Sequence, residues 1–135
     1  MSTLRILFVD DQPDFKVLPA IKYLENKEVD FSYEILKSAV SAMRYIFRNA
    51  DNIDLIVLDL GLPLYENDYS DYDKLEGLSI ISQLLRENRK IPVIINSETD
   101  IPNEEKFLEA YRKNAKVEHV KELFDDWFLE FINNL

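Results

Sequence analysis

The fold of this chain is decided around the stretch Ile53-Asp54-Leu55-Ile56-Val57-Leu58-Asp59-Leu60-Gly61-Leu62-Pro63. Its apolar residues form a run with the length of a buried strand, and the run stops at one acid, Asp59, with Gly and Pro close behind. A carboxylate where a buried strand meets a loop can serve as a nucleophile. The stretch therefore predicts a central strand that ends in a candidate reactive carboxylate.

Three further apolar runs also end in polar or charged residues. The run at 4–9 stops at Asp10 and Asp11, the run at 91–96 stops at Ser97, and the run at 116–120 stops at Lys121. The carboxyl ends of parallel strands meet at one edge of an open α/β sheet, which is where such folds place their sites. We therefore expect the three carboxylates, the hydroxyl and the ammonium to converge there.

Strand-like runs alternate with amphipathic segments along the whole chain, which predicts an α/β fold built from five βα repeats. We expect strands near residues 4–9, 31–37, 53–58, 91–96 and 116–120. We expect helices near residues 15–26, 39–49, 76–88, 103–113 and 122–134. Polar residues in the second and fifth strands indicate the two sheet edges. Pro19 predicts that the first helix either begins late or kinks.

Length and composition exclude several classes of protein. The 135 residues fit one domain, 1–135, with no room for an output domain beside it, and a hydrophobic content of 47% is typical of an ordered core. No apolar run has the length of a membrane span, no signal peptide is recognisable, and there is no cysteine, so we expect a cytoplasmic protein. The net charge of −10 argues against nucleic-acid binding.

The acids at the predicted sheet edge point to metal-assisted phosphoryl chemistry. Asp10, Asp11 and Asp59 would repel one another unless a cation lay among them, and Mg²⁺ suits carboxylates together with a backbone oxygen such as that of Gly61. Because His119 is the single histidine, we expect no imidazole at this edge. An aspartate can form an aspartyl phosphate, and the chain has no Gly-rich loop, so ATP is not expected to be the direct donor.

Four motifs resemble the receiver domain of two-component response regulators. They are Phe8-Val9-Asp10-Asp11-Gln12-Pro13, Asp54-Leu55-Ile56-Val57-Leu58-Asp59-Leu60-Gly61-Leu62-Pro63, Ile91-Pro92-Val93-Ile94-Ile95-Asn96-Ser97 and Asn114-Ala115-Lys116-Val117-Glu118-His119-Val120-Lys121. They occur in the family's order and cover the whole chain. The resemblance implies a flavodoxin-like, doubly wound parallel sheet of five strands in the order 2-1-3-4-5.

The resemblance also implies a set of roles. Asp59 would be the phosphoacceptor, Asp10, Asp11, Asp59 and Gly61 would bind Mg²⁺, Ser97 would respond to the phosphoryl group and Lys121 would pair with it. The donor would be a phosphohistidine on a sensor histidine kinase or histidine phosphotransfer protein, and the output would be binding to a downstream effector protein. Such a domain catalyses its own phosphorylation and dephosphorylation. A homodimer through the face of residues 103–134 is a further hypothesis.

Departures from the family pattern keep one alternative open. Glu122 follows the lysine where proline is usual, Glu118 replaces the usual switch aromatic, and the loop between Pro63 and Gly77, which includes the segment 64–74, is longer than in typical members. Glu118 and Glu122 motivate the alternative, a phosphorylation-independent interaction domain with the same fold. A phosphatase of the haloacid-dehalogenase kind would need a second Asp where Gly61 stands.

Overall fold

Five parallel strands form one sheet in the computed structural model, which describes residues 3–68 and 76–135. The strands are β1 (Leu4–Val9), β2 (Phe31–Leu36), β3 (Leu55–Leu58), β4 (Val93–Asn96) and β5 (Val117–Val120). Their order is β2-β1-β3-β4-β5, so the predicted flavodoxin-like topology and the two predicted edge strands are confirmed.

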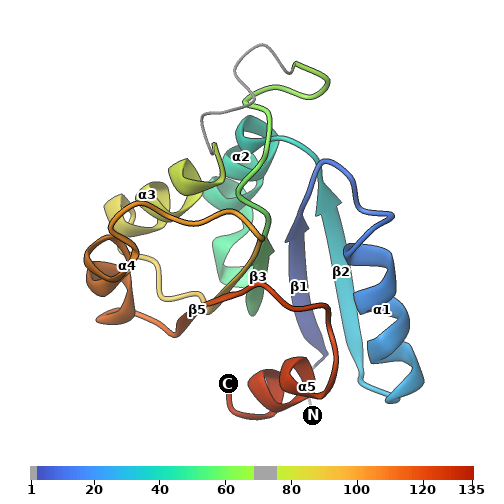
Figure 1. The fold of residues 1–135 in the computed structure, drawn as a ribbon. Helices are drawn as coiled ribbons and strands as arrows, with labels where there is room; N and C mark the ends of the chain where they lie inside the picture. The colour runs from blue at the N-terminus through green and yellow to red at the C-terminus, as the bar shows by residue number, and fades with distance from the viewer. Residues whose placement is uncertain (1–2, 69–75) are drawn as a thin grey trace.

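Helices cover both faces of this sheet (Figure 1). One face carries α2 (Ala39–Asn49), α3 (Gly77–Arg86) and α4 (Glu104–Arg112), and the other carries α1 (Val17–Asn26) and α5 (Asp126–Asn133). A short 3-10 helix, η1 (Ala50–Asn52), leads into β3. The arrangement is that of a doubly wound fold, in which each connection crosses from one parallel strand to the next through a helix.

The two core layers follow from the alternation of side chains along the central strands. Leu7 and Val9 of β1 pack in the layer under α2, α3 and α4, whereas Ile6 and Phe8 pack in the layer under α1 and α5. All four residues of β3 and all four of β4 are buried. Strands covered on both faces must be apolar at every position, which explains their continuous apolar runs.

Two helices begin later than the periodicity predicts, each for a local reason. The first begins at Val17, so Pro19 lies in its first turn, where a missing backbone N–H costs no helical hydrogen bond. Helix α5 begins at Asp126 because the side chain of Asp125 accepts a hydrogen bond from the backbone N–H of Trp127 at 3.0 Å. Leu123, predicted on the apolar face of this helix, instead precedes it and is 70% exposed.

Part of the predicted loop at 64–74 lies outside the described residues, namely positions 69–74. The part at 64–68 contains no helix or strand.

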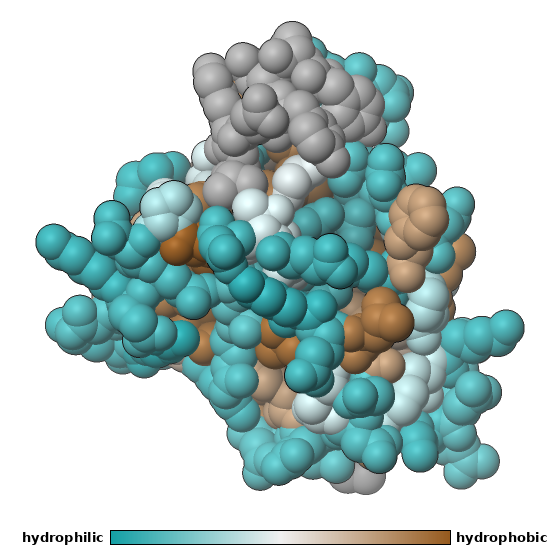
Figure 2. Space-filling model, viewed as in Figure 1, coloured by the Kyte–Doolittle hydropathy of each residue, from teal (hydrophilic) through white to brown (hydrophobic). Residues whose placement is uncertain are grey.

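The molecular face in Figure 2 is mainly hydrophilic, with small and separate hydrophobic areas. Among residues 3–68 and 76–135 there is no helix with the length and apolar character needed to cross a membrane.

Candidate functional site

Strand pairing places the acids of β1 and β3 side by side. Val9 lies opposite Leu58 in the register of the two strands, and the next residue, Asp59, donates its backbone N–H to the carbonyl of Val9 at 2.9 Å. Asp10 therefore leaves the sheet directly beside Asp59. Carboxylate oxygens of Asp10, Asp11 and Asp59, which we call the acid cluster, lie within 4.8 Å of one another.

The acid cluster gathers three carboxylates, and their proximity contributes to the pKa of Asp10. Asp10 is only 5% exposed, and its burial raises the pKa of its carboxyl to about 6, with further upward contributions from the charges of Asp59 and Asp11. A hydrogen bond of 2.8 Å from the backbone N–H of Gln12 and the charge of Lys16 act in the opposite direction on this pKa without cancelling the rise. A divalent cation would lower it. The donor set, three carboxylates and no sulfur or imidazole ligand, fits Mg²⁺.

Two glycines shape the loop that follows Asp59. The backbone N–H of Gly61 donates to Oδ1 of Asp59 at 3.3 Å, which turns the loop back over the carboxylate. Gly77 begins α3 so close to this loop that a Cβ atom there would lie 2.5 Å from the backbone oxygen of Asp59. Sequence reasoning gave Gly77 no role, although its being one of only two glycines was a usable signal.

An open hollow of about 290 Å³ lies over the acid cluster and reaches Ser97. Ser97 is 3% exposed, and its Oγ accepts a hydrogen bond of 3.3 Å from the backbone N–H of Thr99. Gly61 and Lys16 also line the hollow. The structure therefore brings together the predicted residues Asp10, Asp11, Asp59, Gly61 and Ser97.

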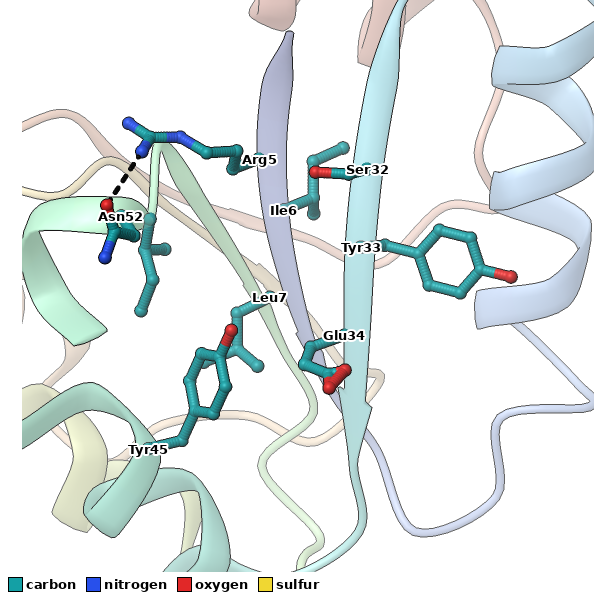
Figure 3. Close-up of a pocket in the computed structure, with 9 residues that line it drawn as sticks. Arg5, Ile6, Leu7, Ser32, Tyr33, Glu34, Tyr45 and Asn52 are labelled. Atoms are coloured by element: carbon teal, nitrogen blue, oxygen red, sulfur yellow. Dashed lines mark hydrogen bonds between the residues drawn. The ribbon is translucent and has the colours of Figure 1, made fainter. Parts of the chain in front are cut away.

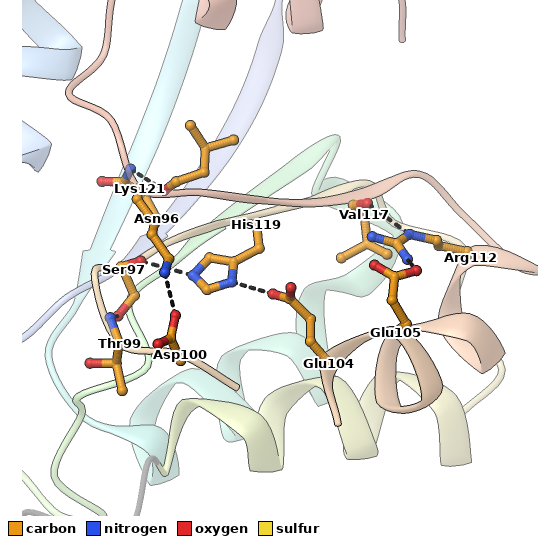
Figure 4. A network of polar contacts seen from close by, with 11 residues as sticks. Asn96, Ser97, Thr99, Asp100, Glu104, Glu105, Arg112, Val117, His119 and Lys121 are labelled. Atoms are coloured by element: carbon orange, nitrogen blue, oxygen red, sulfur yellow. Dashed lines mark hydrogen bonds and ion pairs between the residues drawn. The ribbon is translucent and has the colours of Figure 1, made fainter. Parts of the chain in front are cut away.

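Lys121, the remaining predicted residue, points elsewhere in this structure. Its Nζ forms an ion pair with the carboxylate of Asp100, and the side chain is 53% exposed (Figure 4). This pairing raises the pKa of Lys121 and lowers that of Asp100. The lysine does not line the hollow over the acid cluster.

The expectation that no imidazole lies at this edge is wrong. His119 is inward-facing in β5, and its Nε2 lies 2.8 Å from the backbone oxygen of Ser97 (Figure 4). Its Nδ1 contacts the carboxylate of Glu104 at the start of α4. The ring thus joins the loop after β4 to α4. His119 lies two residues before Lys121, and side chains two residues apart in an extended chain point to the same face. This spacing could have predicted that His119 lies near the site.

Lys16 is a cation of this site that sequence reasoning did not select. It precedes α1, lines the hollow with Asp10 and Asp59, and its Nζ lies 3.5 Å from the backbone oxygen of Asn96. Its charge lowers the pKa of Asp10. Of the two lysines near the strand ends, Lys16 is therefore the one that already faces the acid cluster.

A second hollow, of about 350 Å³, lies beside β1 and β2 and offers no comparable chemistry (Figure 3). Its cation, Arg5, already forms a two-point ion pair with Asp54, with nitrogen to oxygen distances of 3.0 Å. Tyr33 and Tyr45 lie on different sides of the two strands and do not converge. We therefore assign the candidate site to the acid cluster.

Comparison with known proteins gives a consistent result at the level of fold. No protein-family model matches the sequence, and no curated protein matches it. Among solved structures, the chain is similar to a CheY-like response regulator receiver domain protein from Methanospirillum hungatei. The TM-score is 0.69 and the identity 21%, with 98% of this chain and 93% of that chain covered.

Two further solved structures are similar to the same extent. One is CheY from Borrelia burgdorferi in a CheX-CheY-BeF3-Mg complex, with a TM-score of 0.71 and 21% identity over 97% of this chain and 87% of that chain. The other is the phosphorylated cyanobacterial phytochrome response regulator RcpA, with a TM-score of 0.65 and 20% identity over 98% and 91%. The chain has the fold of response-regulator receiver domains.

Proposed function

We propose that the chain is the phosphoacceptor receiver of a two-component phosphorelay and that Asp59 accepts the phosphoryl group. The observation that carries this proposal is the acid cluster, in which Asp59 ends the central strand within 4.8 Å of Asp10 and Asp11. The similar structures supply independent support, because one was solved with BeF3 and Mg and another in a phosphorylated form.

The chemistry follows from the groups around Asp59. A carboxylate oxygen of Asp59 attacks the phosphorus of a phosphohistidine, the phosphorus–nitrogen bond breaks, and the imidazole leaves with the bonding electron pair. Asp10, Asp11, Asp59 and the carbonyl of Gly61 would hold Mg²⁺, which supplies charge neutralisation for the carboxylates and the phosphoryl oxygens. Lys16 adds positive charge from its present position. The Ser97 hydroxyl and, after release from Asp100, Lys121 would bind phosphoryl oxygens.

The decisive experiment is phosphorylation by a small donor. Incubation with acetyl phosphate and Mg²⁺ should add one phosphoryl group in intact-mass measurements, and chelation of Mg²⁺ should prevent it. Asp59→Asn should abolish the adduct, whereas Asp54→Asn, at the opposite end of β3 and paired with Arg5, should keep it. An adduct of equal yield on the Asp59→Asn variant would disprove the assignment.

The partners implied by this function are proteins. A sensor histidine kinase or a histidine phosphotransfer protein would supply the phosphoryl group, and an effector protein would respond to it. We propose a cytoplasmic site of action, where such kinases present their phosphohistidine. The phosphorylated chain would switch the face of α4, β5 and α5, and self-association through that face is tested by light scattering with and without beryllofluoride.

A phosphorylation-independent interaction domain is the second candidate, and one observation favours it. Lys121 pairs with Asp100 and Glu118 occupies the switch position, so the side of the site formed by β5 departs from the pattern of a responsive receiver. The same labelling experiment separates the two candidates. Absence of any adduct under conditions that label another receiver would favour this second function.

A further inference from the structure

A groove of about 440 Å³ runs between α2 and α3, and it shares no residue with the acid cluster or the hollow above it. Its apolar part comes from α2, where Val40, Met43 and Phe47 follow one another at the spacing of one helical stripe. Phe47 is 69% exposed. The groove therefore combines a concave shape with a large apolar side chain that the fold leaves in water.

Helix α2 also carries a buried apolar stripe, which attaches the helix to the rest of the fold. Ala39, Ala42 and Ile46 have no exposed surface and satisfy the packing of α2 on the sheet and α3. Met43 packs partly against this core, whereas Phe47 lies outside it and is not needed to attach the helix. Exposing a large aromatic side chain contributes nothing to folding, whereas its burial against another surface would be favourable.

Arginines surround this apolar stripe. Arg44 and Arg48 of α2 and Arg86 of α3 line the groove, and none of them forms an ion pair with a residue in 3–68 or 76–135. The acid that lines the groove, Glu87, already accepts hydrogen bonds from Gln83 and Arg89. The groove is thus lined by three arginines and by one carboxylate that already accepts hydrogen bonds, in a chain whose net charge is −10.

We propose that this groove docks an acidic amphipathic helical segment of a partner protein. A large apolar side chain of that segment would cover Met43 and Phe47, and its carboxylates would pair with Arg44, Arg48 and Arg86, which offer planar, two-point binding. The binding mode is that of an amphipathic helix in a groove, in which apolar anchors supply affinity and charges supply orientation. It requires no phosphoryl group on Asp59.

Charge favours this occupant over two others. The overall charge of −10 repels a nucleic-acid backbone, which three arginines do not offset. A second copy related by a two-fold axis would place the same three arginines of both copies against each other, and like charges in contact are unfavourable. An acidic segment meets neither obstacle.

Selection from a library of random peptides tests the proposal without a known partner. The probe is a displayed library of peptides of about 16 residues, roughly four helical turns, panned against the immobilised full chain. Enriched sequences should combine several Asp or Glu residues with Leu, Phe or Trp at helical spacing. In NMR titrations of the labelled chain, the best peptide should shift the amide signals of Val40, Met43, Phe47 and Arg86.

Matched variants assign the binding to the groove. Arg44→Glu combined with Arg86→Glu should weaken peptide binding at least tenfold, and so should Phe47→Ser, whose side chain is already exposed. The control Lys22→Glu with Lys106→Glu changes the net charge equally on other exposed helix positions, and Leu123→Ser removes an equally exposed apolar side chain elsewhere. Both controls should bind within about twofold of the original chain.

Several results would overturn the proposal. They are enrichment of basic or wholly polar peptides, peptide binding that the groove variants leave unchanged, no enrichment at all, and self-association of the chain that Phe47→Ser abolishes. The last result would identify a second copy as the occupant. Because none of these readouts involves phosphorylation, failure here is separable from failure of the receiver assignment, which labelling of Asp59 tests.

Discussion

The acid cluster and the polar network of β5 lie at the same edge of the sheet, yet they differ in how their charges are balanced. In the acid cluster, the charges of Asp59 and Asp11 add to the burial that raises the pKa of Asp10 to about 6. In the β5 polar network, which consists of the Lys121–Asp100 pair and the contacts of His119 with Glu104 and Ser97, the Lys121 cation is paired with a carboxylate and both ring nitrogens of His119 have a polar partner.

This difference bears on the proposed function at two places, the acid cluster and Lys121. Positive charge brought to the acid cluster would offset the repulsion that contributes to the raised pKa of Asp10. If Asp59 is phosphorylated as proposed, Lys121 would reach the phosphoryl group only after it leaves Asp100, so its pairing would favour the unphosphorylated arrangement. Under the proposed function, the acid cluster would bind the cation and the phosphoryl group, and the β5 polar network would set how readily the chain responds.

The largest effect is expected from crowding the acid cluster at Gly77. Gly77→Ala places a methyl group 2.5 Å from the backbone oxygen of Asp59 and 2.8 Å from Cα of Leu60, both of them backbone atoms that cannot rotate away. We expect a loss of about 2–4 kcal/mol in the free energy of unfolding. Urea denaturation measures it.

Gly61→Ala is the matched control for this change. A Cβ atom at Gly61 has nothing within 4 Å, and the residue does not have a positive φ. Its free energy of unfolding should change by less than about 1 kcal/mol. If the two substitutions destabilised the chain equally, the close approach of α3 to Asp59 would not be the reason for glycine at position 77.

The next effect concerns the β5 polar network at His119, whose side chain is 6% exposed. Its two contacts, the Glu104 carboxylate and the Ser97 carbonyl, are both groups that accept hydrogen bonds. His119→Ala should lower the free energy of unfolding by about 1–3 kcal/mol, because the backbone oxygen of the buried Ser97 and the carboxylate of Glu104 lose their partner.

Hydrogen exchange distinguishes the local effect of His119→Ala from a general loss of stability. Amides from Ser97 to Glu104 should exchange faster in the variant, whereas those of β1 should change only with global stability. Glu105→Ala, which breaks the exposed pair with Arg112, should leave both measurements nearly unchanged. If amide exchange became faster to the same extent throughout the sheet, His119 would not act as a link between the β4–α4 loop and α4.

Asp10→Asn should have a smaller effect of opposite sign on stability. The native pKa of Asp10 is raised from 3.8 to about 6, so between these values the native state binds more protons than the unfolded chain. Its contribution to stability is therefore present at low pH and is lost as the pH rises through about 6. At pH 7 the variant should be more stable by about 1–2 kcal/mol.

The pH dependence and the metal response check this assignment. The stability advantage of Asp10→Asn should shrink toward pH 4, and Mg²⁺ should stabilise the original chain but not the variant. A variant that loses stability at pH 7, or that responds to Mg²⁺ as the original chain does, would contradict the interpretation that Asp10 is held in an unfavourable charged state.

Much of the fold could be predicted because its signals are local. The apolar runs of β1, β3 and β4 reflect burial on both faces, and the polar alternation of β2 and β5 reflects their edge positions. The acid cluster was predictable for the same reason, since parallel strands bring their ends together whatever the loops do.

The remaining features depend on side-chain directions and distances that the chain order does not encode. Lys121 follows β5 as predicted, but its long flexible side chain pairs with Asp100, an exposed acid in the loop between β4 and α4. Lys16 precedes a helix and gives no periodic signal, and the need for glycine at Gly77 depends on how closely α3 approaches Leu60. Such contacts between distant segments require the three-dimensional structure.

The smallest change in stability, and the sharpest test of the comparison, comes from releasing Lys121. Asp100→Ala removes an exposed partner, so the free energy of unfolding should not change measurably. If the pair holds Lys121 away from Asp59, the variant should be labelled by acetyl phosphate about two- to fivefold faster. Lys121→Ala should cancel this gain when the two substitutions are combined. Unchanged labelling of Asp100→Ala would mean that the lysine exchanges freely between its partners and that the β5 polar network does not restrain the site.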